Sequence, residues 1–190
     1  MSSLPIAIGG FIALVVVVMF KLKLSTRRRV PFPAWKADPV NAYARLVRAG
    51  AGTELDILED STRTLLGTPD ACAMVGTWVR LGAKVRLLVH ETSDDDASRV
   101  KKASAHAGAG SLTLYALKKS ARTSALGKDT RTFHFAVARS PDQLWLEGYH
   151  ADDDAAAQLC EYVPDAKRDP RWQARADDFD KLLADATEVK

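Results

Sequence analysis

The apolar residues divide the chain into one long N-terminal stretch and a region of shorter, mixed patterns. Leu4–Phe20 contains 17 residues without a charged side chain. As a helix this stretch spans roughly 25 Å, and Leu22 and Leu24 extend it because the flanking lysines can reach the headgroups. No basic residue precedes it and no small-x-small pattern follows it, which disfavours a cleaved signal peptide. The sequence therefore predicts a transmembrane anchor over residues 1–24.

Basic residues directly after the anchor predict its orientation. Five cations follow the anchor within nine residues: Lys21, Lys23, Arg27, Arg28 and Arg29. The N-terminal flank, in contrast, has no basic side chain. Basic flanks stay in the cytoplasm, so we expect the N-terminus outside, the rest of the chain in the cytoplasm, and a single pass through the cytoplasmic (inner) membrane. We assign these five side chains to the membrane interface, which makes the lipid bilayer an expected partner.

A basic, proline-rich segment, residues 25–52, is expected between the anchor and the main domain. Pro31 and Pro33 predict a stiff extended linker, because residues before proline avoid the helical conformation. Asp38-Pro39 then predicts the start of a short helix, with aspartate as its N-cap. Trp35, between the two, is a candidate contact for a partner protein.

Residues 53–190 alternate between strand and helix patterns and predict one α/β domain. Strand, helix and strand joined by a tight glycine turn predict a parallel pair. The expected strands are 54–59, 84–89, 111–117, 132–138 and 144–149, the last two forming a hairpin. The expected helices are 68–81, a helix capped by Ser93 that ends before Gly108, 155–162 and 169–188. Residues 118–130 are expected to form an exposed loop. The predicted fold class is therefore α/β: one transmembrane helix followed by a mixed, partly parallel sheet flanked by helices.

The last helix carries a narrow apolar stripe. Trp172, Phe179, Leu182 and Leu183 share one face of a helix that is otherwise rich in charged residues. The stripe predicts docking on the sheet of the same domain. A partner subunit is the alternative, so Trp172 and Phe179 are also candidate partner contacts.

Composition and charge narrow the function classes. The 190 residues suffice for one domain and a short appendage, and the two cysteines form no disulfide framework, which suits reduced thiols. The net charge is +3, but without the five anchor cations the chain has 22 basic and 24 acidic residues. A nucleic-acid-binding domain is expected to be basic over its own surface, so the sequence predicts no nucleic-acid partner.

Two stretches give the domain a family resemblance. Residues 78–89, Trp-Val-Arg-Leu-Gly-Ala-Lys-Val-Arg-Leu-Leu-Val, look like a helix-glycine-strand segment, and Phe133-His134-Phe135-Ala136-Val137 falls where a catalytic strand would lie. Over roughly Thr53–Ala184 the chain resembles one half of a phospholipase D-superfamily domain. That family's motif is His-x-Lys with aspartate five residues after the lysine.

The resemblance implies a phosphodiesterase chemistry that this chain carries only in part. In the family two motifs meet, one histidine attacks phosphorus, the other protonates the leaving group, and the lysines hold the phosphate. Here His134 matches the histidine, but Ala136 stands at the lysine, Pro141 at the aspartate, and Asp142 one place late. A second histidine would require a dimer. His134 is thus the candidate catalytic residue. A histidine on a strand is more often packed against its neighbours than used in catalysis, so we expect that the protein is not an enzyme.

Metal and cofactor patterns give no site prediction. His90, His134 and His150, with Glu91 or Glu147, could in principle surround a metal, but no ligand spacing supports it. The acidic triplets 94–96 and 152–154 are explained by the positive ends of helices. The sequence therefore predicts no metal site and no cofactor.

The expected function is that of a non-catalytic accessory or scaffolding subunit of a larger membrane complex, such as a respiratory or photosynthetic one. Its partners would be other membrane-protein subunits. One alternative is a membrane-anchored phosphodiesterase that acts as a dimer with His134 as nucleophile. A second alternative is an anionic-lipid-binding domain that uses Arg27–Arg29 together with Lys118, Lys119 and Arg122.

Overall fold

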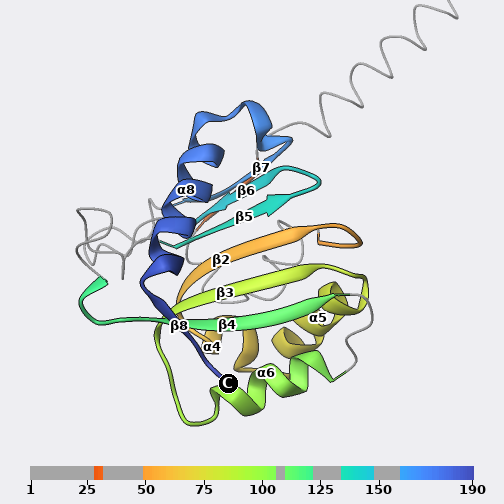
Figure 1. Ribbon diagram of the computed structural model, residues 1–190. Coiled ribbons are helices and arrows are strands. Elements are labelled where there is room, and N and C mark those ends of the chain that lie inside the picture. The colour runs from red at the N-terminus through yellow and green to blue at the C-terminus, as the bar shows by residue number, and fades with distance from the viewer. Residues whose placement is uncertain (1–27, 32–48, 106–109, 122–133, 148–158) are drawn as a thin grey trace, which may run out of the picture.

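Eight strands form one mixed sheet in the order β1-β7-β6-β5-β2-β3-β4-β8. This computed structural model describes residues 28–31, 49–105, 110–121, 134–147 and 159–190. The strands are β1 (Arg28–Pro31), β2 (Glu54–Ser61), β3 (Lys84–Glu91), β4 (Ser111–Leu117), β5 (Phe135–Arg139), β6 (Gln143–Leu146), β7 (Leu159–Pro164) and β8 (Ala186–Glu188). The helices are α4 (Arg63–Leu66), α5 (Pro69–Arg80), α6 (Asp96–Ser104), the 3₁₀ turn η3 (Ala166–Arg168) and α8 (Pro170–Ala184). The predicted partly parallel α/β sheet flanked by helices is confirmed (Figure 1).

Strands β2, β3 and β4 form the parallel centre of the sheet. Thr68 caps α5, because its hydroxyl accepts a hydrogen bond from the backbone N–H of Ala71 at 3.2 Å. Gly82, with φ of +93°, makes the left-handed turn from α5 into β3. Helix α6 begins at Asp96 rather than at the predicted Ser93, whose backbone N–H and hydroxyl bind the Asp96 carboxylate at 2.7 and 2.9 Å.

Strands β5, β6 and β7 extend the sheet on the other side of β2. The predicted hairpin is present, since β5 and β6 pair antiparallel. The predicted helix over 155–162 is wrong where the structure describes it, because Leu159–Pro164 is strand β7, paired with β6 and β1. Cys160 and Tyr162 are buried while Glu161 between them is half-buried, which is the alternation of a strand. Pairing on both sides outweighs the helical preference of the preceding alanines.

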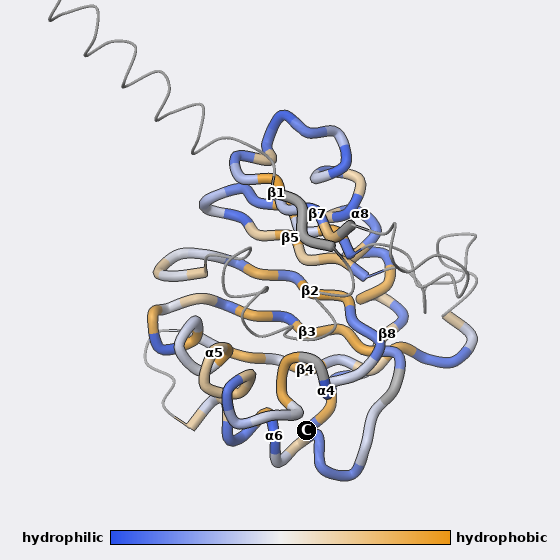
Figure 2. Tube along the Cα trace, turned by 180° about the vertical axis from the view of Figure 1, so that it is seen from behind, coloured by the Kyte–Doolittle hydropathy of each residue, from blue (hydrophilic) through white to orange (hydrophobic). Residues whose placement is uncertain are grey.

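The sheet separates two apolar layers. Residues of β2 at odd positions, such as Leu55 and Ile57, pack with α4 and α5 in the first layer. Leu58, which points to the other face, packs with Phe135 and α8 in the second. Figure 2 shows hydrophobic residues concentrated along the central strands. The α4–α5–α6 layer and the α8 layer therefore lie on opposite faces of one sheet.

Helix α8 docks on this sheet, as its apolar stripe predicts. Asp169 caps it by accepting a hydrogen bond from the backbone N–H of Arg171 at 3.0 Å. Phe179 and Leu182 are fully buried in the second layer. Trp172 is half-buried, and its indole N–H donates to the backbone carbonyl of Ala138 on β5 at 3.1 Å. The helix is thus fixed to the sheet by apolar burial and by a side-chain hydrogen bond.

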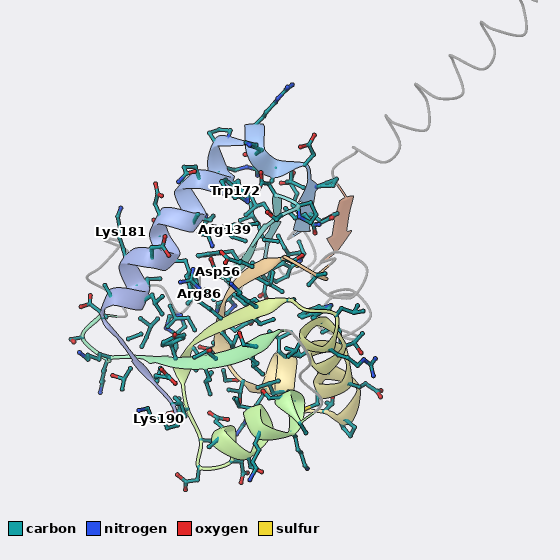
Figure 3. The ribbon with its side chains drawn as sticks, turned by 45° about the vertical axis from the view of Figure 1, so that its right-hand side comes forward. Asp56, Arg86, Arg139, Trp172, Lys181 and Lys190 are labelled. Carbon is teal, nitrogen blue, oxygen red and sulfur yellow. The ribbon has the colours of Figure 1, made fainter. Side chains whose placement is uncertain are left out.

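A buried ion cluster lies where α8 crosses the sheet. Asp56 on β2 is fully buried, and both of its carboxylate oxygens accept hydrogen bonds from Arg86, at 2.6 and 2.9 Å. Arg139 from β5 also donates to Asp56. Figure 3 shows these three side chains beneath α8. The hydrogen bonds that Arg86 donates to Asp56 raise the pKa of Arg86, whose guanidinium also lies 5.1 Å from the centre of the Phe179 ring.

The predicted anchor over residues 1–24 lies outside the described residues, as do Trp35 and the helix expected after Asp38. Within the part that the structure describes, no helix is long and apolar enough to cross a bilayer. Arg28 and Arg29, expected at the membrane interface, begin strand β1, which pairs antiparallel with β7. The sheet therefore takes one strand from the segment 25–52, which the sequence predicts as a separate linker.

Candidate functional site

One end of the sheet brings together three polar residues from three neighbouring strands. Leu58 on β2 lies opposite Phe135 on β5, and Phe135 lies opposite Leu146 on β6. The next residues outward along these strands are Glu59, His134 and Glu147. The backbone N–H of Glu147 donates to the carbonyl of His134 at 3.2 Å, which keeps these two strands together at this point.

The three side chains also point to the same face. Ile57, Ala136 and Trp145 belong to the apolar layer under α4 and α5, and each is two residues from a member of the trio. Side chains two residues apart on a strand share a face, so the alternation that buries those apolar residues directs Glu59, His134 and Glu147 to that layer. We call these three residues the Glu-His-Glu cluster. It lies at the carboxyl ends of parallel strands β2 and β3, where open α/β sheets commonly bind ligands.

The side chains of the Glu-His-Glu cluster are in direct contact. His134 Nδ1 lies 3.1 Å from Glu147 Oε2, which is hydrogen-bond distance. The same Nδ1 lies 4.0 Å from Glu59 Oε2. The side chains of His134, Glu59 and Glu147 are only 3%, 2% and 4% exposed. His90 from the end of β3 is also buried, with its ring centre 6.3 Å from that of His134.

Burial opposes the ionisation of Glu59. Removal from water raises the pKa of the Glu59 carboxyl well above its usual range, and the nearby negative charges of Glu147 and Asp60 raise it further. Glu59 Oε1 is buried and has no hydrogen-bond partner among the described residues. The cluster therefore contains one oriented histidine, one carboxylate bonded to it, and one carboxyl group held in an environment that opposes its ionisation.

The structure separates the positions of the phospholipase D-like motif. Ala136 is 1% exposed and packs in the apolar layer, so the position of the family's lysine is a core position here. Pro141 and Asp142 lie in the turn between β5 and β6, at the opposite end of these strands from His134. Of the motif positions, only His134 reaches the Glu-His-Glu cluster.

The remaining predicted residues lie elsewhere. Phe179 is fully buried under α8 and Trp172 is half-buried against β5, so both contact their own domain. Asp96 is buried, and hydrogen bonds from Thr62 and Ser93 lower the pKa of its carboxyl against the opposing effect of burial. Lys118 and Lys119 are exposed after β4. The positions outside the described residues are Lys21, Lys23, Arg27, Trp35, Arg122, His150 and Asp152–Asp154.

Sequence reasoning missed Glu59. It lies near the carboxyl end of strand β2, on the buried face that also contains Leu55 and Ile57, so it continues an apolar alternation with an acidic residue. A carboxyl group at a core-facing position is costly unless it has a partner or a function. That break in the pattern was the available signal. The partners of Glu59 could not be identified in the same way, because the pairing of β2 with β5 connects residues far apart in the chain.

Glu59→Gln should stabilise the metal-free protein, and increasingly so as the pH rises. The folded-state pKa of Glu59 is raised, so the folded protein keeps a proton that the unfolded chain releases above about pH 4.5. Between that pH and the folded-state pKa, each pH unit costs the wild type about 1.4 kcal/mol of stability. Glutamine has the same shape and no such cost. Chemical denaturation in EDTA at pH 5 and pH 8 measures the difference.

The matched control is Glu54→Gln, which removes a carboxylate from the exposed part of the same strand, where the Glu54 side chain is 51% exposed. This control should change stability little at either pH. Equal effects of the two substitutions at both pH values would contradict the raised pKa of Glu59.

Comparison with known proteins gives a fold relationship and no family. No protein-family model matches the chain, and no curated protein matches it. The structure of TrmBL2, described as an archaeal chromatin protein with a novel mode of DNA binding, aligns with a TM-score of 0.56 at 14% identity, over 96% of this chain and 63% of that one. Polyphosphate kinase from Porphyromonas gingivalis aligns with a TM-score of 0.46 at 9% identity, over 87% of this chain and 24% of that one. At these identities the likeness to TrmBL2 shows the fold alone, and this chain spans less than two thirds of that protein's structure.

The prediction that excludes nucleic acid as a partner is wrong. TrmBL2 has this fold, and its structure is described as showing DNA binding. The prediction rests on the excess of acidic over basic residues after the anchor cations are removed, 24 against 22. A net charge does not report how charges are distributed over one surface. A slightly acidic chain of this fold therefore does not exclude nucleic acid.

Proposed function

We propose that the chain is a membrane-tethered, non-catalytic accessory subunit whose α/β domain resembles a degenerate half of the phospholipase D type. The observation that carries this proposal is the residue two positions after His134. The resemblance places a lysine there, and this chain has Ala136, buried in the apolar layer at 1% exposure. Without a cation at that position, the charge that develops on a phosphate in the transition state would be left without its main stabilisation.

The charges around His134 favour the same function. Two carboxyl groups face its imidazole, Glu147 at 3.1 Å and Glu59 at 4.0 Å. A phosphodiester brought to His134 would meet the Glu147 carboxylate and, once it ionises, the Glu59 carboxylate as well. Like charges repel more strongly in a water-excluded site than in bulk water. These surroundings oppose attack on phosphorus, so they support a domain that does not catalyse phosphoryl transfer.

The position of β1 supports a short tether. The apolar stretch is expected to end at Leu24, and the edge strand β1 begins at Arg28. Four steps along an extended chain cover at most about 14 Å. The edge of the sheet formed by β1 would thus be held near the membrane surface, with Arg28 and Arg29 close to the headgroups. A domain held at so short a distance is suited to a fixed place among other membrane subunits.

A phosphodiesterase assay tests the non-catalytic part of the proposal. The full chain in mild detergent, assayed on bis(p-nitrophenyl) phosphate, should hydrolyse it no faster than the His134→Ala variant. Hydrolysis that the substitution abolishes would contradict the proposal and favour the dimeric phosphodiesterase, in which a second copy supplies the other histidine.

Co-purification tests the accessory role. The full chain, extracted in mild detergent and treated with nuclease, should recover the same membrane proteins in repeated experiments. The nuclease step removes proteins that are bridged only by nucleic acid. A chain that runs alone as a monomer would contradict the proposal, and partners lost on nuclease treatment would point to nucleic acid instead.

A further inference from the structure

The Glu-His-Glu cluster has the composition and spacing of a metal-binding site. One ligand atom from each of Glu59, His134 and Glu147 lies within 4.8 Å of the others. Two atoms that each lie about 2.1 Å from one ion can be at most about 4.2 Å apart. The distances from His134 Nδ1 to the two carboxylate oxygens, 3.1 and 4.0 Å, both satisfy this limit. Two of the three distances therefore already suit a shared ion, and the 4.8 Å bound on the third calls for at most a small side-chain rotation, with no change in the strands.

The cluster also has an unmet need for positive charge. Glu59 is 2% exposed, its Oε1 has no hydrogen-bond partner in the described part of the chain, and its other oxygen lies 4.0 Å from His134 Nδ1. Two carboxylates in a site without water are costly when nothing neutralises them. A divalent cation would neutralise both at once, with the histidine as a neutral ligand. The arrangement thus favours a cation of charge two over a monovalent one.

The donor atoms indicate the class of metal. Imidazole nitrogen together with carboxylate oxygen suits zinc and other divalent transition metals, whereas calcium and magnesium prefer oxygen-only sites. His90, whose ring centre is 6.3 Å from that of His134, lies beside the cluster. It adds a second buried imidazole to the surroundings of the ion. The absence of a thiolate from the cluster points away from metals that require sulfur.

We propose that Glu59, His134 and Glu147 bind one divalent transition-metal ion, zinc or a metal of similar ligand preference. The ion would connect the ends of β2, β5 and β6 through side chains. This site goes beyond the accessory role proposed above and does not depend on it, because a structural ion needs no catalytic lysine. Conversely, the accessory role does not require an ion.

Zinc titration of the full chain tests the proposal. The protein, free of any histidine tag, is treated with EDTA, returned to metal-free buffer in detergent, and titrated with zinc chloride by calorimetry. We expect one ion per chain and a rise in melting temperature. Glu59→Gln, His134→Gln and Glu147→Gln should each weaken binding by about 100-fold or more, since loss even of groups that only support ligands costs about 10–100-fold.

Two variants separate a lost ligand from a lost fold. Glu54→Gln removes an exposed carboxylate from the same strand as Glu59 and should bind zinc like the wild type. Glu59→Gln keeps the size and shape of the side chain, and its melting curve without metal shows whether it is folded before zinc is added. A wild type that binds no zinc, or zinc binding that survives all three cluster substitutions, would overturn the proposal.

Discussion

Replacing Phe179 with alanine should lower the free energy of unfolding by about 3–5 kcal/mol. The Phe179 side chain is fully buried between α8 and the sheet, and Arg86 lies over its ring at 5.1 Å. Truncation removes a large apolar surface and leaves a cavity that the neighbouring strands cannot readily fill. For a chain of this size the melting temperature should fall by roughly 6–20 °C.

Thermal and urea unfolding of the full chain in detergent measure this loss. Lys181→Ala, on the same helix at a side chain that points away from the sheet in Figure 3, is the matched control and should change stability by less than about 0.5 kcal/mol. If Phe179→Ala leaves the unfolding curve unchanged and instead prevents the recovery of partner proteins, the helix does not depend on this ring for docking. That result would favour the alternative in which the stripe contacts a partner subunit.

Removing both arginines that bind Asp56 should destabilise the domain by a similar amount. In the variant Arg86→Met with Arg139→Met, the fully buried Asp56 carboxylate would have lost both of its cations. Breaking a buried ion pair from one side typically costs about 3–5 kcal/mol, because the remaining charge is left without compensation. The two arginines are themselves 33% and 25% exposed, so most of the effect should come from the stranded carboxylate.

Rescue by a third substitution identifies that mechanism. Adding Asp56→Asn to the double variant removes the uncompensated charge and should recover a large part of the lost stability in urea unfolding. A triple variant no more stable than the double variant would show that the arginines act through packing on Phe179 and α8 rather than through charge.

Local patterns in the sequence predict the parallel centre of the fold well. Helix α5 begins after Thr68 because the threonine hydroxyl caps it, and the turn that follows the helix contains Gly82 because its backbone is left-handed there. The stretch 155–162 was mispredicted because its alanines favour a helix on their own, whereas Cys160 and Tyr162 are fixed in β7 by partners on both sides. Strand pairing between distant segments is not contained in such a local pattern.

In the candidate site, too, local patterns predict one part and long-range strand pairing determines the rest. His134 could be found from the sequence because it lies in a recognisable strand motif. Glu147 stands out in the sequence only as one of several acidic residues near histidines, and Glu59 is not among the predicted site residues. All three meet only after the register of β2, β5 and β6 is known, and that register is set by apolar residues elsewhere on these strands.

Anomalous diffraction at the zinc edge, from crystals of the full chain grown with zinc chloride, tests most directly whether these three residues form one binding site. We expect one strong anomalous peak enclosed by Glu59, His134 and Glu147, with ligand distances of about 2.0–2.2 Å. The peak should be absent from crystals of Glu59→Gln grown in the same way. The proposed metal site would be contradicted if the crystals show no zinc at this end of the sheet and His134 Nδ1 still lies within hydrogen-bond distance of Glu147 Oε2, at about the present 3.1 Å.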